Sequence, residues 1–140
     1  MTDTMAHLKL TLAGAQKILN AALAKAAALG VPQNIVITDD GGHMLAMARM
    51  DGAKPLSILS ALAKAKTAAS ARIPTGGAAA EIELKLALAQ NMNYTNLRGG
   101  LPIVIDGKCI GAIGVGSGTG DQDVEVAKAG LAALPGAQGF

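Results

Sequence analysis

Two turn signals, each set between two short apolar runs, place the strongest limit on how this chain can fold. The first is Asp39-Asp40-Gly41-Gly42, between NIVIT (34–38) and HMLAMARM (43–50). The second is Asp106-Gly107, between the apolar runs 101–105 and 108–115. Because an Asp-Gly pair tolerates the positive φ angles of a type I′ turn, the two patterns predict two antiparallel β-hairpins.

Segments with helical periodicity precede, separate and follow the hairpins. After Thr11, a residue suited to cap a helix, apolar residues recur at three- and four-residue spacing until Gly30. Three more helices are predicted, from Ser57 as a cap to about Arg72, from 78 to about 92, and from 120 to 134. This order lacks βαβ spacing, so it predicts an α+β fold in which helices flank an antiparallel sheet.

The length and composition predict one domain that assembles with copies of itself. A chain of 140 residues matches a single domain over 1–140. Its residues are 51% hydrophobic but only 1% aromatic, so the apolar side chains are mainly Ala, Leu, Ile, Val and Met. A small core cannot cover all of them, and we therefore expect a homo-oligomer whose interfaces cover the remainder.

Several partner classes are excluded by what the sequence contains. The net charge is +2, and there is no basic cluster and almost no aromatic residue on which a base could stack, so no nucleic-acid partner is expected. The N-terminal segment does not resemble a secretory signal, and no apolar run approaches the roughly 20 residues of a membrane span. A cytoplasmic protein without a membrane partner is therefore expected. Cys109 has no second cysteine with which to form a disulfide.

The glycine-rich stretch RGGLPIVIDGKCIGAIGVGSGTGDQD (98–123) suggests a nucleotide loop, but its spacing does not match one. The series that begins Gly114-x-Gly116 has Thr119 where a dinucleotide fingerprint needs a glycine, and no P-loop pattern is present. The stretch is instead interpreted as part of a pocket for another ligand. The alternative is that its glycines let the backbone approach another strand or subunit.

Arg98 beside Gly99 and Gly100 suggests an anion site, because a guanidinium can grip a carboxylate next to accessible backbone N–H groups. We expect these residues and the 114–120 loop, with Gly116 and Gly118, to form one pocket at the edge of the sheet. The alternative for Arg98 is an ordinary surface residue before a loop.

Candidates for proton transfer or ligation are few. The two histidines are His7, in the N-terminal segment, and His43, just after a glycine turn. A neutral imidazole can bind a metal or haem iron, or move a proton, although both histidines can equally be surface residues. Lys66 either faces a pocket or extends into water, and Asp39 is either a turn residue or a proton carrier. No pattern of paired Cys or His residues predicts a zinc site.

In combination and order, several motifs resemble the GlcG/HbpS-like family. The motifs are Asp39-Asp40-Gly41-Gly42-His43, Arg49-Met50-Asp51-Gly52-Ala53, Lys64-Ala65-Lys66-Thr67-Ala68, Pro74-Thr75, Gly99-Gly100-Leu101-Pro102-Ile103, Asp106-Gly107, Gly111-Ala112-Ile113-Gly114-Val115 and Asp121-Gln122-Asp123. Such domains occur as glycolate-operon accessory proteins, as secreted haem-binding proteins and as C-terminal domains of PduO-type cobalamin adenosyltransferases. The resemblance implies a profilin-like sheet of about five antiparallel strands flanked by helices, and assembly into dimers to octamers.

Two functions are compatible with this resemblance. The first is binding of haem or a related tetrapyrrole, with His43 or His7 as the axial ligand. The alternative is an isomerase, tautomerase or lyase of small-molecule catabolism, in which Arg98 holds a carboxylate-bearing substrate and His43, Lys66 or Asp39 moves a proton. Whether the chain is an enzyme, and on what substrate, stays open at this point.

Overall fold

The computed structural model describes all 140 residues, and its sheet is formed by the two predicted hairpins. The elements are α1 (Leu12–Leu29), β1 (Asn34–Asp39), β2 (Met44–Arg49), α2 (Ser57–Ala71), α3 (Ala80–Ala89), β3 (Gly100–Ile105), β4 (Lys108–Gly116) and α4 (Gly120–Ala132). The strand order is β2-β1-β4-β3, and every neighbouring pair is antiparallel. The α+β class with an antiparallel sheet is therefore confirmed.

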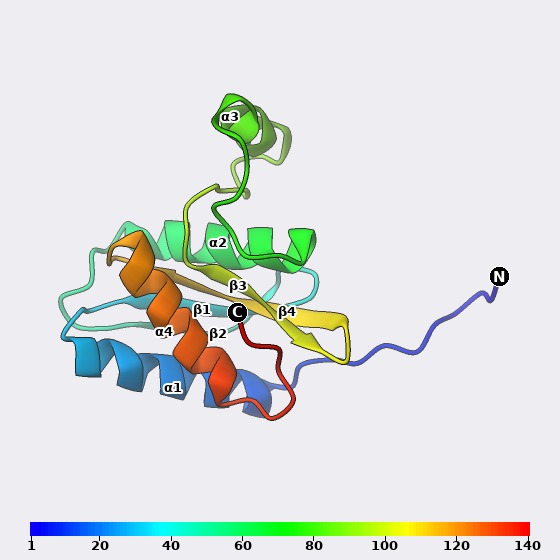
Figure 1. Ribbon diagram of the computed structural model, residues 1–140, viewed down its shortest axis with the longest axis horizontal. Helices are drawn as coiled ribbons and strands as arrows, with labels where there is room; N and C mark the ends of the chain where they lie inside the picture. Colours follow the sequence, from blue (N-terminus) through cyan, green and yellow to red (C-terminus); the bar gives the residue numbers. More distant parts are fainter.

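The helices form a layer on each face of the sheet (Figure 1). One layer is α2, which packs on β1, β3 and β4, and the other consists of α1 and α4, which also pack on each other. The main core lies under α1 and α4, where Ile18, Ile35, Ile113 and Val126 are fully buried. The α2 side is packed with smaller residues such as Ala61 and Ala65, so that helix lies close to the strands.

Glycines in β4 allow this close approach. A Cβ atom on Gly114 would lie 1.9 Å from the carbonyl oxygen of Ala61, and one on Gly116 would lie 2.9 Å from that of Ser57. Real Cβ atoms essentially never come this close to backbone, so α2 can occupy its position only over glycines. These two glycines of the 98–123 stretch thus serve helix-to-sheet packing.

The fold has four strands, whereas the family resemblance implied about five. The chain after α4 comes nearest to a fifth strand, beside β3. There Ala137 forms one isolated bridge with Ile105, and the Gln138 N–H donates to the Val104 carbonyl. The turn at Gly136, with a φ of 81°, directly precedes this contact, which is a single bridge and not a strand.

The helix termini agree with the sequence-based expectations for α1 and differ from them for α2 and α3. Thr11 caps α1 as predicted, since its side chain accepts the N–H of Gly14. Ser57 does not cap α2; it is the first residue of that helix, and Leu56 precedes it without a side-chain cap. The third helix is shorter than predicted, because Asn91 and Met92 adopt positive φ angles that end it.

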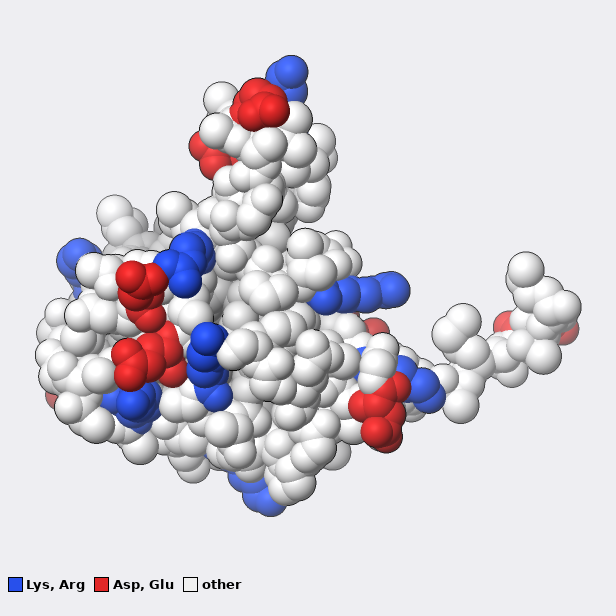
Figure 2. Space-filling model, viewed as in Figure 1, with Lys and Arg blue, Asp and Glu red and all other residues white.

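Helix α3 stands away from the body of the molecule (Figure 1), and Figure 2 shows it as a separate knob. None of the other helices and strands packs extensively against it. Its side chains Leu84 and Leu88 are exposed, as is Met92 just after it. None of the helices has the length and apolar character needed to span a membrane.

Candidate functional sites

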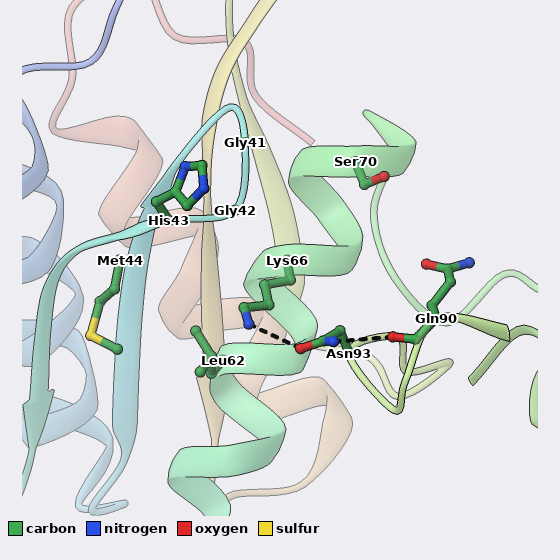
Figure 3. A pocket seen from close by; sticks show the side chains of 9 residues that line it. All are labelled: Gly41, Gly42, His43, Met44, Leu62, Lys66, Ser70, Gln90 and Asn93. Carbon is green, nitrogen blue, oxygen red and sulfur yellow. Dashed lines mark hydrogen bonds between the residues drawn. The ribbon is translucent and has the colours of Figure 1, made fainter. Parts of the chain in front are cut away.

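The largest cavity, about 620 Å³, opens between the β1–β2 turn and α2. Figure 3 shows His43 on the turn, Leu62, Lys66 and Ser70 on the facing side of α2, and Asn93 closing another side. The volume lies in the range of about 300–1,000 Å³ that is typical of sites for cofactors and drug-sized ligands. We refer to it as the His43 cavity.

Asp39 fixes both the position and the tautomer of His43. Its Oδ1 accepts the N–H groups of Gly41 and His43, each at 2.9 Å, and His43 Nδ1 lies 3.2 Å from the same oxygen. Burial alone would raise the pKa of the Asp39 carboxyl, but these hydrogen bonds and the nearby imidazole outweigh it and lower the pKa. An ionised carboxylate only accepts, so in the neutral imidazole Nδ1 carries the hydrogen and Nε2 keeps its lone pair.

The ring of His43 is available to a ligand, because its side chain is 81% exposed. A carboxylate behind Nδ1 is the arrangement that orients a ligating histidine and makes its other nitrogen more basic. Across the cavity, Lys66 Nζ donates to Asn93 Oδ1 at 2.9 Å, as the dashed line in Figure 3 shows. The structure thus brings Asp39, His43 and Lys66 together.

His7 lies in a separate place. Its Nε2 is 3.2 Å from Asp40 Oδ2, and it lines a cavity of about 540 Å³ beside Arg72 and Cys109. Burial raises the pKa of the Cys109 thiol, so that thiol is protonated at neutral pH. No group of three or more His, Cys, Asp or Glu side chains is placed to hold a bare metal ion.

Arg98 lines a different, smaller cavity of about 200 Å³ at the other end of the sheet, together with Gly118 and Gly120. Its guanidinium pairs with Asp121. The His43 turn follows the Asp39 end of β1, whereas this cavity lies at the Asn34 end, about 17 Å away at 3.3 Å per residue. The enzyme hypothesis required Arg98 and His43 in a single site, and such a site does not form within one chain.

Of the remaining glycines of the predicted anion pocket, Gly100 lines a further cavity of about 220 Å³ together with Arg98, whereas Gly99, Gly114 and Gly116 line neither the His43 cavity nor the cavity of about 200 Å³. A Cβ on Gly99 would lie 2.8 Å from both Asp123 Cβ and the carbonyl oxygen of Val115, and one on Gly100 would lie 2.5 Å from the carbonyl oxygen of Lys64. The α4 N-terminus offers fewer free N–H groups than expected, because Thr119 and Gln122 form a capping box.

A buried ion pair that sequence reasoning missed forms one wall of the cavity of about 200 Å³. Lys64 Nζ lies 2.8 Å from Asp123 Oδ2 and donates to the Val115 carbonyl at 2.7 Å, and the two side chains are only 5% and 3% exposed. Asp123 Oδ1 also accepts the N–H of Gly118 at 3.0 Å. We refer to this site as the Lys64 cavity; the one signal for it in the sequence was the presence of both residues among the family motifs.

Comparison with known proteins places the chain in a family. The family model described as "Haem degrading protein HbpS-like" matches residues 10–132, so the chain belongs to the HbpS-like family. A curated relative, Protein GlcG of Escherichia coli strain K12, is 41% identical over 83 residues. That match covers 59% of this chain and 62% of GlcG, so it spans less than two thirds of the relative's length.

Solved structures of this family share the fold over nearly the whole chain. A double mutant of Streptomyces reticuli HbpS is 34% identical with a TM-score of 0.84, covering 94% of this chain and 91% of that one. The PduOC:Heme complex is 25% identical with a TM-score of 0.86, covering 95% and 99%. Family membership and a haem-complexed structural neighbour agree with the resemblance found in the sequence.

Proposed function

We propose that this protein binds haem or a closely related tetrapyrrole in the His43 cavity, with His43 Nε2 as the axial ligand. The observation that carries the proposal is the exposed imidazole whose Nδ1 is held by Asp39 at 3.2 Å, so that Nε2 presents its lone pair to the solvent. The family's description and the PduOC:Heme complex support the same ligand class.

The residues around His43 suit the other parts of such a ligand. Leu62 and Met44 offer apolar surface to a macrocycle, and the Lys66 ammonium can pair with a propionate. When bound, haem supplies an iron centre that takes an axial nitrogen ligand. His7 is the weaker candidate, because its Nε2 is already occupied by Asp40.

A titration of the protein with haemin, followed by its Soret band, tests this proposal. Wild type is expected to saturate and His7→Ala to behave as wild type. His43→Ala is expected to bind at least about 100-fold more weakly with a changed band position, because losing the ligating nitrogen costs at least as much as losing its outer-shell partner. Equal titrations of wild type and His43→Ala would contradict the proposal. A change confined to His7→Ala would move the site to the cavity beside Cys109.

The role of Lys66 is tested with the dimethyl ester of iron protoporphyrin, which lacks propionate charge. Lys66→Gln is expected to weaken haemin binding severalfold and to leave the ester's affinity unchanged, because a salt bridge needs both charges. An equal loss for both ligands would exclude a propionate contact.

We also propose that the protein is a homo-oligomer, in which a neighbouring subunit covers the exposed apolar side chains of α3 and of the residues just after it. An isolated helix as short as α3 is marginal in water, and the exposed Leu84, Leu88 and Met92 need a covering surface. Light scattering at micromolar concentration is expected to give at least twice the chain mass of 13.9 kDa. A monomer would contradict this.

A further inference from the structure

The Lys64 cavity has polar or charged side chains at seven of its ten lining residues, and the haem proposal gives it no role. Its volume is about 200 Å³, and Leu97 is the one hydrophobic residue in its wall. Pockets for drug-sized ligands begin at about 300 Å³, so this cavity suits a molecule of only a few non-hydrogen atoms.

Hydrogen-bond donors exceed free acceptors in this cavity. The Lys64 ammonium has three N–H groups, of which the Val115 carbonyl and Asp123 Oδ2 take two. Ser117 Oγ accepts the Lys54 N–H at 2.9 Å, and its own O–H has no protein acceptor. Both oxygens of Asp123, the one carboxylate in the wall, are already engaged. A ligand that enters this cavity therefore meets hydrogen-bond donors that lack an acceptor.

The charges in the wall favour a monoanion. The cationic side chains are Lys54, Lys64 and Arg98. Lys64 is neutralised by Asp123 and Arg98 by Asp121, whereas Lys54 is exposed and forms no ion pair. A single positive charge thus remains uncompensated, which matches one carboxylate better than a dianionic phosphate.

From these observations we infer that the Lys64 cavity binds a small polar monocarboxylate. The carboxylate lies toward Lys54 and the free N–H of Lys64, and the serine hydroxyls receive the polar part of the ligand. Ser57 contributes one of these hydroxyls, which is free because Ser57 does not cap α2.

This site is separate from the His43 cavity. Ser57, Ser60 and Lys64 line it from one stripe of α2, whereas the His43 cavity is lined by Leu62, Lys66 and Ser70. Two residues along a helix correspond to a rotation of about 200°, so the two stripes lie on opposite sides of α2. The inference therefore does not depend on haem binding.

Nuclear magnetic resonance titrations with lactate and propionate at constant ionic strength test the inference. The two acids have the same number of carbons, but only lactate carries a hydroxyl. Lactate is expected to shift the backbone N–H signals of Ser117 and Gly118 and to bind more tightly than propionate. Lys54→Gln is expected to weaken lactate binding about tenfold, because it removes the uncompensated charge, and Ser57→Ala to reduce the preference for lactate.

Lys17→Gln is the matched control, because it removes the same charge from an exposed position on α1, in the other helix layer. It is expected to bind lactate as wild type does, as is His43→Ala. No lactate-dependent shift, or equal affinities in wild type and Lys54→Gln, would overturn the inference. Tighter binding of inorganic phosphate than of lactate would overturn the assignment to a monocarboxylate.

Discussion

Lys64 and Lys66 are two residues apart on one helix, yet they line two different cavities, the Lys64 cavity and the His43 cavity. Lys64 is buried and held by a carboxylate and a carbonyl, whereas Lys66 reaches across an open cavity to an amide. The Lys64 cavity is built around a buried ion pair, whereas the His43 cavity is lined by an exposed imidazole and an exposed hydrogen bond. Burial, more than residue type or motif, separates a lysine that the fold requires from one whose loss the fold tolerates.

The largest expected effect is a loss of stability on replacing Lys64, which replacing Lys66 should not cause. Lys64→Met leaves the Asp123 carboxylate buried without its partner, so the free energy of unfolding should fall by about 3–5 kcal/mol. Lys66→Met removes an exposed hydrogen bond and should cost less than about 1 kcal/mol. Urea unfolding followed by far-ultraviolet circular dichroism measures both variants. Equal losses would contradict the distinction between the two regions.

A second pair of variants tests the His43 cavity through the carboxylates beside the two histidines. Asp39→Asn removes the acceptor that holds His43 Nδ1, and haem affinity should fall about 10- to 100-fold. Asp40→Asn makes the same change next to His7 and should leave haem affinity unchanged. The measurement is the haemin titration described above. The reverse order of effects would assign the ligand to His7.

The pH dependence of stability should reflect Asp39, because its pKa is lowered in the folded state. A lowered pKa means that folding favours the ionised form, so the contribution is present in full above the ordinary value of 3.8. It is lost as the pH falls from there through the lowered pKa. The stability difference between wild type and Asp39→Asn should therefore shrink on acidification. A difference that grew at low pH would contradict the lowered pKa.

The smallest expected effect is that of His43→Ala on stability. The ring is 81% exposed, so its removal should change the free energy of unfolding by no more than about 0.5 kcal/mol. A loss of several kcal/mol, measured by urea unfolding, would show that His43 supports the fold and would weaken its assignment as a free ligand.

The sequence alone was sufficient to predict the hairpins, the class of fold and the family. The strands around Asp39-Asp40-Gly41-Gly42 and Asp106-Gly107 form where they were expected, because turn chemistry and β-branched runs act over a few neighbouring residues. The Thr11 cap could be predicted from the sequence for the same reason.

Helix periodicity alone also places Lys64 and Lys66 on opposite sides of α2, but it does not show which side is buried. That was decided by β4, whose glycines bring the helix close to the sheet. The pairing of Lys64 with Asp123 joins residues 59 positions apart, and no local pattern encodes such a contact. The separation of Arg98 from His43 likewise depends on strand order. The tertiary structure alone therefore decided that the chain has these two separate cavities, because packing between distant segments determines which polar groups meet and which remain free.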